Sequence, residues 1–171
     1  MFKKTAFHLI LAMSLIFTAG CIIDPPEDYL DTYLEFYDGG TYVYFPGGYD
    51  PDPDYQDLIC AWIYWDDVHG LYKMTIDATR ADDSEYFVFD ITGFPDGMDL
   101  GSYDLIDYAL VEYYYDSQTY DAVSGSVTLT YIDSVGGAIE GEFEGGFEPR
   151  VSGSDITITG GFFRALRVSE P

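Results

Sequence analysis

The residues that most resemble a chemical site form an acidic loop in which carboxylates alternate with prolines. Asp50, Asp52 and Asp54 occupy alternate positions, and Asp57 follows three residues later. Carboxylate oxygens are preferred ligands of Ca²⁺, which takes about six to eight of them. These four residues are therefore a candidate calcium site, and Ca²⁺ is the only cofactor that the sequence indicates.

The spacing of this loop resembles that of the calcium loops of thrombospondin-type repeats. Those loops have a glycine after the third aspartate, where this chain has Tyr55. Pro51 and Pro53 also favour an extended backbone, which wraps an ion poorly. We favour the alternative interpretation, a solvated acidic loop, because runs of like charge usually face solvent.

A second group of carboxylates lies in the sequence AIEGEFEGGFE. Glu140, Glu142 and Glu144 alternate with small and apolar residues, so in a strand the three carboxylates share one face. Neighbouring like charges are unfavourable unless a cation compensates them. Arg164 and Arg167 are expected to lie across from the row as ordinary cross-strand partners. The alternative is a docking strip for a basic partner.

Aromatic residues are concentrated in two short segments. One contains Trp62, Tyr64 and Trp65, and the other is the run 113–115 of three tyrosines. Exposed aromatic rows can stack on sugar rings or form the centre of a protein interface. Consecutive residues of a strand face opposite sides, so at most half of each segment points outward. The rest is expected to build the core.

The chain contains few residues of the types that nucleophilic or zinc-dependent catalysis requires. His69 is the only histidine beyond the first 20 residues, it lies in a polar turn, and no G-x-S-x-G sequence accompanies it. One such histidine and few cysteines do not supply a zinc site. A carboxylate pair for glycoside cleavage remains open, but 31 acidic residues create such pairs by chance. A hydrolase is therefore the weakest functional hypothesis.

Two-residue periodicity dominates the chain and predicts strands. Tyr72, Met74 and Ile76, for example, alternate with polar residues. Turn sequences such as DGG separate the segments, and Gly160 with Gly161 predicts a bulge. The predicted strands are 34–37, 41–45, 58–65, 71–77, 85–91, 109–115, 126–132, 138–148 and 155–168. About nine or ten strands indicate an all-β fold, an antiparallel sandwich or open barrel, with a closed lipocalin-like barrel as the alternative.

The composition indicates a folded and strongly acidic domain. The 171 residues carry a net charge of −24, while 47% are hydrophobic and 18% are aromatic. Such a chain can bury a core, which an intrinsically disordered chain cannot. The charge excludes nucleic acid and anionic lipid as partners and favours cations or a basic partner.

The first 20 residues have the order of an export signal. Lys3 and Lys4 precede an apolar stretch, 7–17, which is too short to span a bilayer, and small residues follow before Cys21. The alternatives are a secretory signal cut elsewhere and an uncleaved anchor. The order predicts a signal-peptide helix over 1–20, an acidic tether with prolines over 21–31 and one β domain over 32–171.

The sequence TAGC resembles the lipobox of bacterial lipoproteins, whose consensus is Leu-Ala-Gly-Cys; Thr18 replaces the leucine. The resemblance implies that the signal is removed and that Cys21 becomes lipidated. Ile22 follows the cysteine, and the absence of aspartate there implies sorting to the outer membrane. Loss of Lys3 and Lys4 changes the net charge from −24 to −26. Cys60 then has no disulfide partner within the chain and is expected to be a buried apolar residue.

The strand plan also resembles that of small uncharacterised lipoproteins of Bacteroidetes-type bacteria. The matching segments are structural glycines and aromatics at 36–42, 101–103, 125–133, 139–145 and 158–162. The resemblance implies an all-β fold outside the cytoplasm and no particular activity. Our leading hypothesis is a non-enzymatic, membrane-anchored envelope protein that binds a glycan or an envelope protein. A calcium-stabilised structural or adhesion protein is the second, and an envelope hydrolase the third.

Overall fold

The computed structural model describes residues 32–47, 59–80 and 84–168, which form ten β-strands. The described residues include no helix of the length and apolarity that a membrane crossing requires. The strands are β1 (Tyr33–Asp38), β2 (Thr41–Pro46), β3 (Ile59–Asp66), β4 (Leu71–Thr79), β5 (Tyr86–Thr92), β6 (Gly101–Asp104), β7 (Ala109–Tyr115), β8 (Gln118–Ile132), β9 (Ala138–Pro149) and β10 (Ile156–Arg167).

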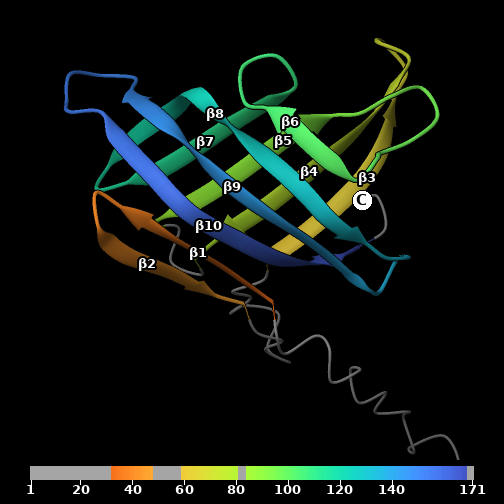
Figure 1. Cartoon of the computed structure of the whole chain (residues 1–171), viewed down its shortest axis with the longest axis horizontal. Coiled ribbons are helices and arrows are strands. Elements are labelled where there is room, and N and C mark those ends of the chain that lie inside the picture. The colour runs from red at the N-terminus through yellow and green to blue at the C-terminus, as the bar shows by residue number, and fades with distance from the viewer. Residues whose placement is uncertain (1–31, 48–58, 81–83, 169–171) are drawn as a thin grey trace, which may run out of the picture.

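Seven of these strands close into a barrel (Figure 1). The order around the ring is β10–β3–β4–β5–β7–β8–β9, and β9 returns to β10. Every neighbouring pair is antiparallel except β10 and β3, which run parallel and meet at Leu166↔Cys60 and Arg167↔Ala61. The predicted all-β fold is confirmed, and closure is of the kind that the barrel alternative described.

The other three strands pair with two strands of the ring, β10 and β8. The β1–β2 hairpin pairs with the first part of β10, before β10 reaches β3 (Figure 1). The strand β8 pairs with β7 through residues 118–121 and with β6 through residues 126–129. Two long strands therefore change partners along their length, and this brings the hairpin beside the ring.

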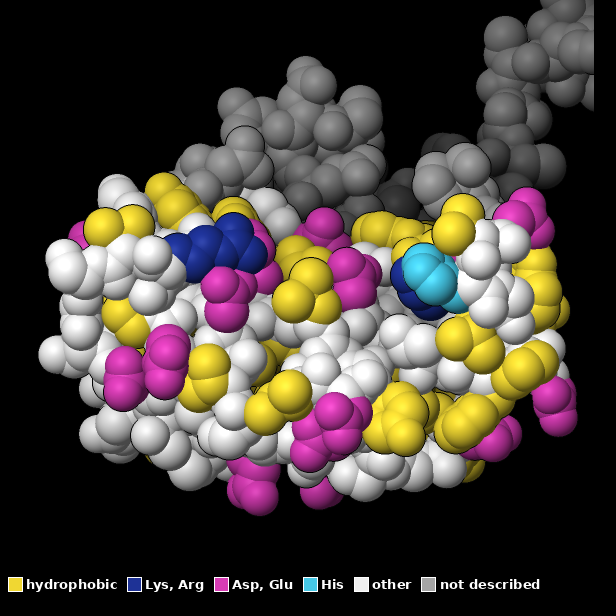
Figure 2. Space-filling model, turned by 90° about the horizontal axis from the view of Figure 1, so that it is seen from above, with side chains coloured by type: hydrophobic (Ala, Val, Ile, Leu, Met, Phe, Trp, Pro, Cys, Tyr) yellow, Lys and Arg dark blue, Asp and Glu magenta, His cyan; other side chains and the backbone are white. Residues whose placement is uncertain are grey.

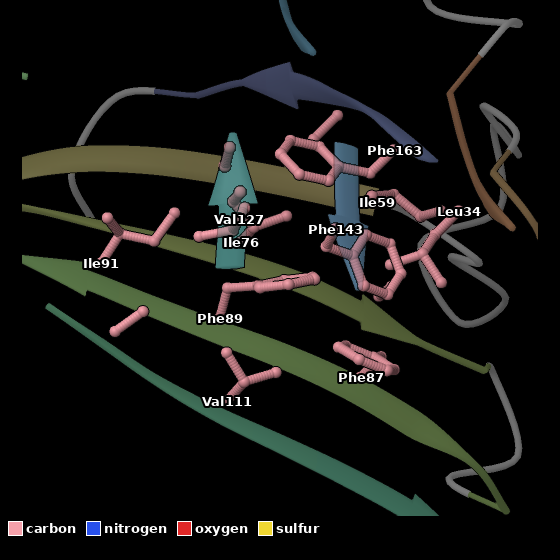
Figure 3. Close-up of a cluster of buried hydrophobic side chains, with 14 of the residues drawn as sticks. Leu34, Ile59, Ile76, Phe87, Phe89, Ile91, Val111, Val127, Phe143 and Phe163 are labelled. Atoms are coloured by element: carbon pink, nitrogen blue, oxygen red, sulfur yellow. The ribbon is translucent and has the colours of Figure 1, made fainter. Parts of the chain in front are cut away.

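Aromatic and aliphatic side chains together fill the interior of the barrel (Figure 3). Phe36 from the hairpin packs with Phe87, Tyr113 and Phe143, at ring-centroid distances of 5.5, 5.4 and 5.9 Å. The ring centroid of Phe89 on β5 lies 5.0 Å from that of Phe143, which comes from β9 on the opposite wall of the barrel. Burial of each such ring contributes roughly 2 kcal/mol of hydrophobic stabilisation. The interior is thus a packed core, and outward-facing side chains are the ones available for binding.

The chain departs from the predicted strands in two places. The four residues of β6 lie in a segment that the sequence presents as turns, and β8 begins at Gln118 rather than at Ser126. Tyr131, which alternation places with Val127 on the inner face, is 45% exposed. A bulge between Leu129 and Tyr131 shifts the register of β8 against β9. The shift turns the Tyr131 side chain from the inner to the outer face.

Candidate functional site

A groove of about 450 Å³ crosses the outer face of β8, β9 and β10. Glu142 and Glu144 project into it from β9, and the hydroxyls of Ser126 and Thr128 line it from β8. The pairing Ser126↔Glu144 and Thr128↔Glu142 places each hydroxyl-bearing residue directly across from a carboxylate. Phe162, paired with Glu142, provides an aromatic wall from β10.

Two glycines on β10 open this groove. The predicted bulge is present, because the register of β10 against β9 shifts between Ile158 and Gly161. A Cβ atom on Gly161 would lie 2.6 Å from the carbonyl oxygen of Phe143, so only glycine fits there. Gly160 has φ +59°, and a Cβ atom there would meet only Tyr37, at 3.7 Å. The bulge therefore leaves an open notch between β9 and β1.

The carboxylate row lies on the outer face, as alternation predicts, but only part of it is compensated. Glu140 pairs with Arg164, whose Nε lies 3.4 Å from the Glu140 carboxylate. Among the described residues, Glu142 and Glu144 have neither an ion-pair nor a hydrogen-bond partner, and both are exposed. The expectation for Arg167 was wrong: its guanidinium donates to the carbonyl oxygen of Asp133. Arg167 lies three residues after Arg164, so its side chain leaves the opposite face of β10.

A continuous row of aromatic rings extends from the groove across β10, β1 and β2, and we call it the tyrosine strip. The ring centroids are 5.5 Å apart for Phe162 and Tyr33 and 6.3 Å apart for Tyr33 and Tyr44. They are 6.4 Å apart for Tyr44 and Tyr42 and 5.5 Å apart for Tyr42 and Tyr37. Its three most exposed members are exposed by 44–51%. In order, the strip consists of Phe162, Tyr33, Tyr44, Tyr42 and Tyr37.

Two tyrosine hydroxyls of this strip, those of Tyr42 and Tyr33, have raised pKa values and are protonated at neutral pH. Tyr42 donates a hydrogen bond of 2.5 Å to Oε2 of Glu35, and this bond raises the pKa of Tyr42 to about 12. Partial burial, followed by the negative charge of Glu35, raises the pKa of Tyr33. The strip therefore presents neutral aromatic faces beside carboxylates.

The other predicted aromatic residues do not share one surface. Trp62 and Tyr64 face the outside of β3, while Trp65 has the opposite parity and its ring lies 5.1 Å from that of Tyr72. The tyrosine run 113–115 likewise divides, with Tyr113 buried in the core. β3 is no hydrogen-bonded neighbour of β9. The Trp62 segment and the glutamate row therefore do not form a single site.

His69 belongs to the turn between β3 and β4. Its Nδ1 lies 2.7 Å from Oδ2 of Asp66, and Nζ of Lys73 lies 2.6 Å from the same oxygen. Oδ1 of Asp66 accepts the backbone N–H groups of Val68 and His69. Figure 2 shows the histidine on the surface beside a basic side chain. In the described residues, Asp66 thus orders a turn, and the contacts of His69 include no serine.

The predicted metal and thiol residues add little to the site. Asp50, Asp52, Asp54 and Asp57, like Cys21, lie outside the described residues, so the calcium and lipidation hypotheses stay predictions. Within the described residues, no group of three or more potential ligands is placed to hold a metal ion. Cys60 is half-buried on the outer side of β3, and burial raises the pKa of its thiol to about 11.

Sequence reasoning identified the glutamate row and the glycine bulge but missed the tyrosine strip. A local signal for the strip exists: Tyr42 and Tyr44 alternate with Val43 and Phe45, so both tyrosines must face away from the core. What joins them to Phe162 is the pairing of β1 with β10, which has no local signature.

The chain matches no protein-family model, no curated protein and no solved structure. The chemical abilities of the site must therefore be judged from its geometry. Flat aromatic faces, carboxylate acceptors and hydroxyl groups can stack on a ligand and hydrogen-bond to it.

Proposed function

We propose that this chain is an exported, lipid-anchored envelope protein whose task is to bind a partner rather than to catalyse a reaction. Its ligand surface is the outer face of β8, β9, β10, β1 and β2. The observation that carries the proposal is the continuity of the tyrosine strip with the groove. Monomeric proteins rarely expose such contiguous aromatic surface unless it takes part in binding.

The anchor part of the proposal rests on the sequence around Cys21. A positive n-region, a short apolar stretch and the TAGC sequence together favour processing to a lipidated cysteine. Ile22 favours the outer membrane as the destination. The residues between Cys21 and the start of β1 at Tyr33 serve as a tether for the barrel.

Metabolic labelling tests the anchor. The chain is produced in a Gram-negative host supplied with radiolabelled palmitate, and the envelope is fractionated. We expect label and outer-membrane association for the natural chain and loss of both for Cys21→Ala. The matched control is Cys60→Ala, which must keep both. If the natural chain is exported into the periplasm without incorporating the palmitate label, the proposed anchor is wrong.

A second experiment tests the ligand face. Soluble glycans and charged peptides are titrated against the natural chain, a Tyr37→Ala/Tyr42→Ala variant and a Tyr108→Ala control. Tyr108 is 50% exposed and lies outside the strip and the groove. We expect at least one ligand whose affinity falls tenfold or more in the Tyr37→Ala/Tyr42→Ala variant only. A tenfold fall is a loss of about 1.4 kcal/mol in binding free energy. If every ligand binds all three chains equally or binds none, the face is not the binding surface.

A further inference from the structure

We propose that the groove and the tyrosine strip bind an arginine-bearing segment of a partner protein, with a guanidinium lying in the notch at Gly160. This inference rests on the proposed binding function and names the chemistry of its ligand. Three features of the barrel carry it: how the chain binds its own arginines, what it leaves uncompensated in the groove, and where open space remains.

The barrel already uses one aromatic ring and one carboxylate to hold an arginine. The guanidinium of Arg80 lies 4.7 Å from the ring centroid of Phe45, and Nε of Arg80 donates to Glu85 at 2.6 Å. Guanidinium is planar, so it can stack on a ring while its edge pairs with a carboxylate. A ring with a nearby carboxylate is thus a working arginine site in this protein.

The outer face repeats this arrangement in two cross-strand rows, and the row of Glu142 and Phe162 lies between them. In the first row, Arg164 lies between Glu140 on β9 and Tyr33 on β1. In the row that contains Glu144, the corresponding part of β10 is the glycine bulge, and Tyr37 lies beyond it on β1. The second row has the carboxylate and the ring of the first but no cation between them.

Open space lies where that cation would sit. The nearest atom to a Cβ on Gly160 is Cδ2 of Tyr37 at 3.7 Å, an ordinary contact distance. The groove reaches from this notch to Glu142 and Glu144. A side chain entering from solvent can therefore approach Glu144 on one side and the ring of Tyr37 on the other.

No described cation of the chain itself is free to occupy the notch. Each basic side chain beyond the first 20 residues is already held by an acidic side chain or a carbonyl group. The pairs are Lys73–Asp66, Arg80–Glu85, Arg150–Asp121, Arg164–Glu140 and Arg167 with the carbonyl oxygen of Asp133. Among the described residues, none of these cations is left to compensate Glu142 and Glu144, so both carboxylates are available to a cationic ligand.

Charge favours a basic polypeptide over a neutral glycan. Covering exposed carboxylates with a neutral ligand removes their hydration without supplying a counter-charge, whereas guanidinium supplies both hydrogen bonds and charge. The negative field of an acidic chain also accelerates encounters with a basic segment. A glycan on the same face is the competing outcome that the experiment must separate.

The test uses the processed chain extracted from membranes in mild detergent, at physiological ionic strength. The probe is a short capped peptide in which arginine alternates with serine, and the matched probe carries citrulline in place of arginine. Citrulline has nearly the same shape without the charge. Neutral oligosaccharides form the third arm, and calorimetry measures each dissociation constant.

We expect the arginine peptide to bind at least tenfold more tightly than the citrulline peptide. Glu144→Gln should weaken it about tenfold, which is the loss of one charge-assisted contact. The matched control is Glu148→Gln, which removes the same charge from an exposed residue of β9 outside the groove, and it should change affinity by no more than about twofold. Tyr37→Ala should weaken binding, and Tyr37→Phe should restore it because the ring face remains.

The remaining outcomes separate the two proposals. Equal losses in Glu144→Gln and Glu148→Gln would mean diffuse charge attraction and would overturn the arginine site. Binding of oligosaccharides, abolished by Tyr37→Ala, together with failure of the arginine peptide would also overturn it while leaving the binding face intact. If neither class binds, both the arginine site and the proposed face are wrong. Thermal melts of each variant confirm that affinity losses do not reflect unfolding.

Discussion

Nε of Arg80 donates a hydrogen bond of 2.6 Å to Oε2 of Glu85, a residue that is only 8% exposed. The other carboxylate oxygen of Glu85 accepts the Tyr113 hydroxyl at 2.8 Å. Nη2 of Arg80 also donates to the carbonyl oxygen of Tyr44 at 3.1 Å. This ion pair therefore connects the β1–β2 hairpin, which carries most of the tyrosine strip, to β5 and β7 of the ring.

Removing the arginine from this connection should destabilise the fold. Arg80→Met leaves Glu85 buried with an uncompensated charge, which costs about 3–5 kcal/mol for fully buried pairs. The Arg80 side chain is 33% exposed, so we expect about 2 kcal/mol and a fall in Tm of about 4–8 °C. Adding Glu85→Gln removes the stranded charge and keeps an acceptor for Tyr113, so the double variant should recover part of the loss. Equal melting of Arg80→Met and the natural chain would contradict this role.

Adjacent residues of β1 should differ sharply in their effect on stability. Phe36 is fully buried and Tyr37 is 47% exposed. Phe36→Ala should cost about 3–5 kcal/mol, because it opens a cavity among the core rings. Tyr37→Ala should cost less than about 1 kcal/mol. Urea denaturation of both variants measures the difference, and similar midpoints would mean that the hairpin is not part of the core.

The strands of the barrel could be predicted from the sequence where alternation is strict. Phe87, Phe89 and Ile91 are all fully buried, as their spacing in β5 requires. The first part of β8 was missed because its residues before Gly125 are half-buried or exposed and so do not alternate clearly between apolar and polar. Strand pairing, rather than side-chain pattern, defines that segment.

Ring closure and the composition of the site depend on contacts distant in sequence. In the described residues, the ladder between β10 and β3 has two residue pairs, and Leu166 and Cys60 lie far apart in the chain. The approach of Tyr37 to Gly160 likewise depends on the pairing of β1 with β10. Local pattern could place the glutamates and the tyrosines on outer faces, but it could not place those faces side by side.

Acid should remove the stabilisation that Asp66 provides. Hydrogen bonds from Lys73 and then from His69 hold the pKa of Asp66 below its ordinary value. A carboxyl with a lowered folded-state pKa stabilises the fold above the unfolded-state pKa of about 3.9, and this contribution is lost as the pH falls further. Asp66→Asn should therefore melt below the natural chain at neutral pH. The gap should narrow as the pH falls from about 4 towards 2, and a constant gap would contradict the assignment.

Gly125 of β8 should tolerate substitution poorly, because steric contact and backbone conformation together oppose a side chain there. Its φ is +116°, and an added Cβ would lie 2.0 Å from the carbonyl oxygen of Glu144. Gly101 is the matched control, since it has φ +147° but nothing within 4 Å of its Cβ position. Gly101→Ala should cost about 1–3 kcal/mol from backbone strain alone.

Gly125→Ala should cost more than its control, because β8 and β9 must also separate at the backbone that carries Glu144. Thermal melts of the two variants measure the difference, and equal losses would show that the close approach of these strands is not required. The same separation moves Glu144 relative to Gly160. Gly125→Ala should therefore also weaken any ligand of the groove, while Gly101→Ala should leave its affinity within about twofold.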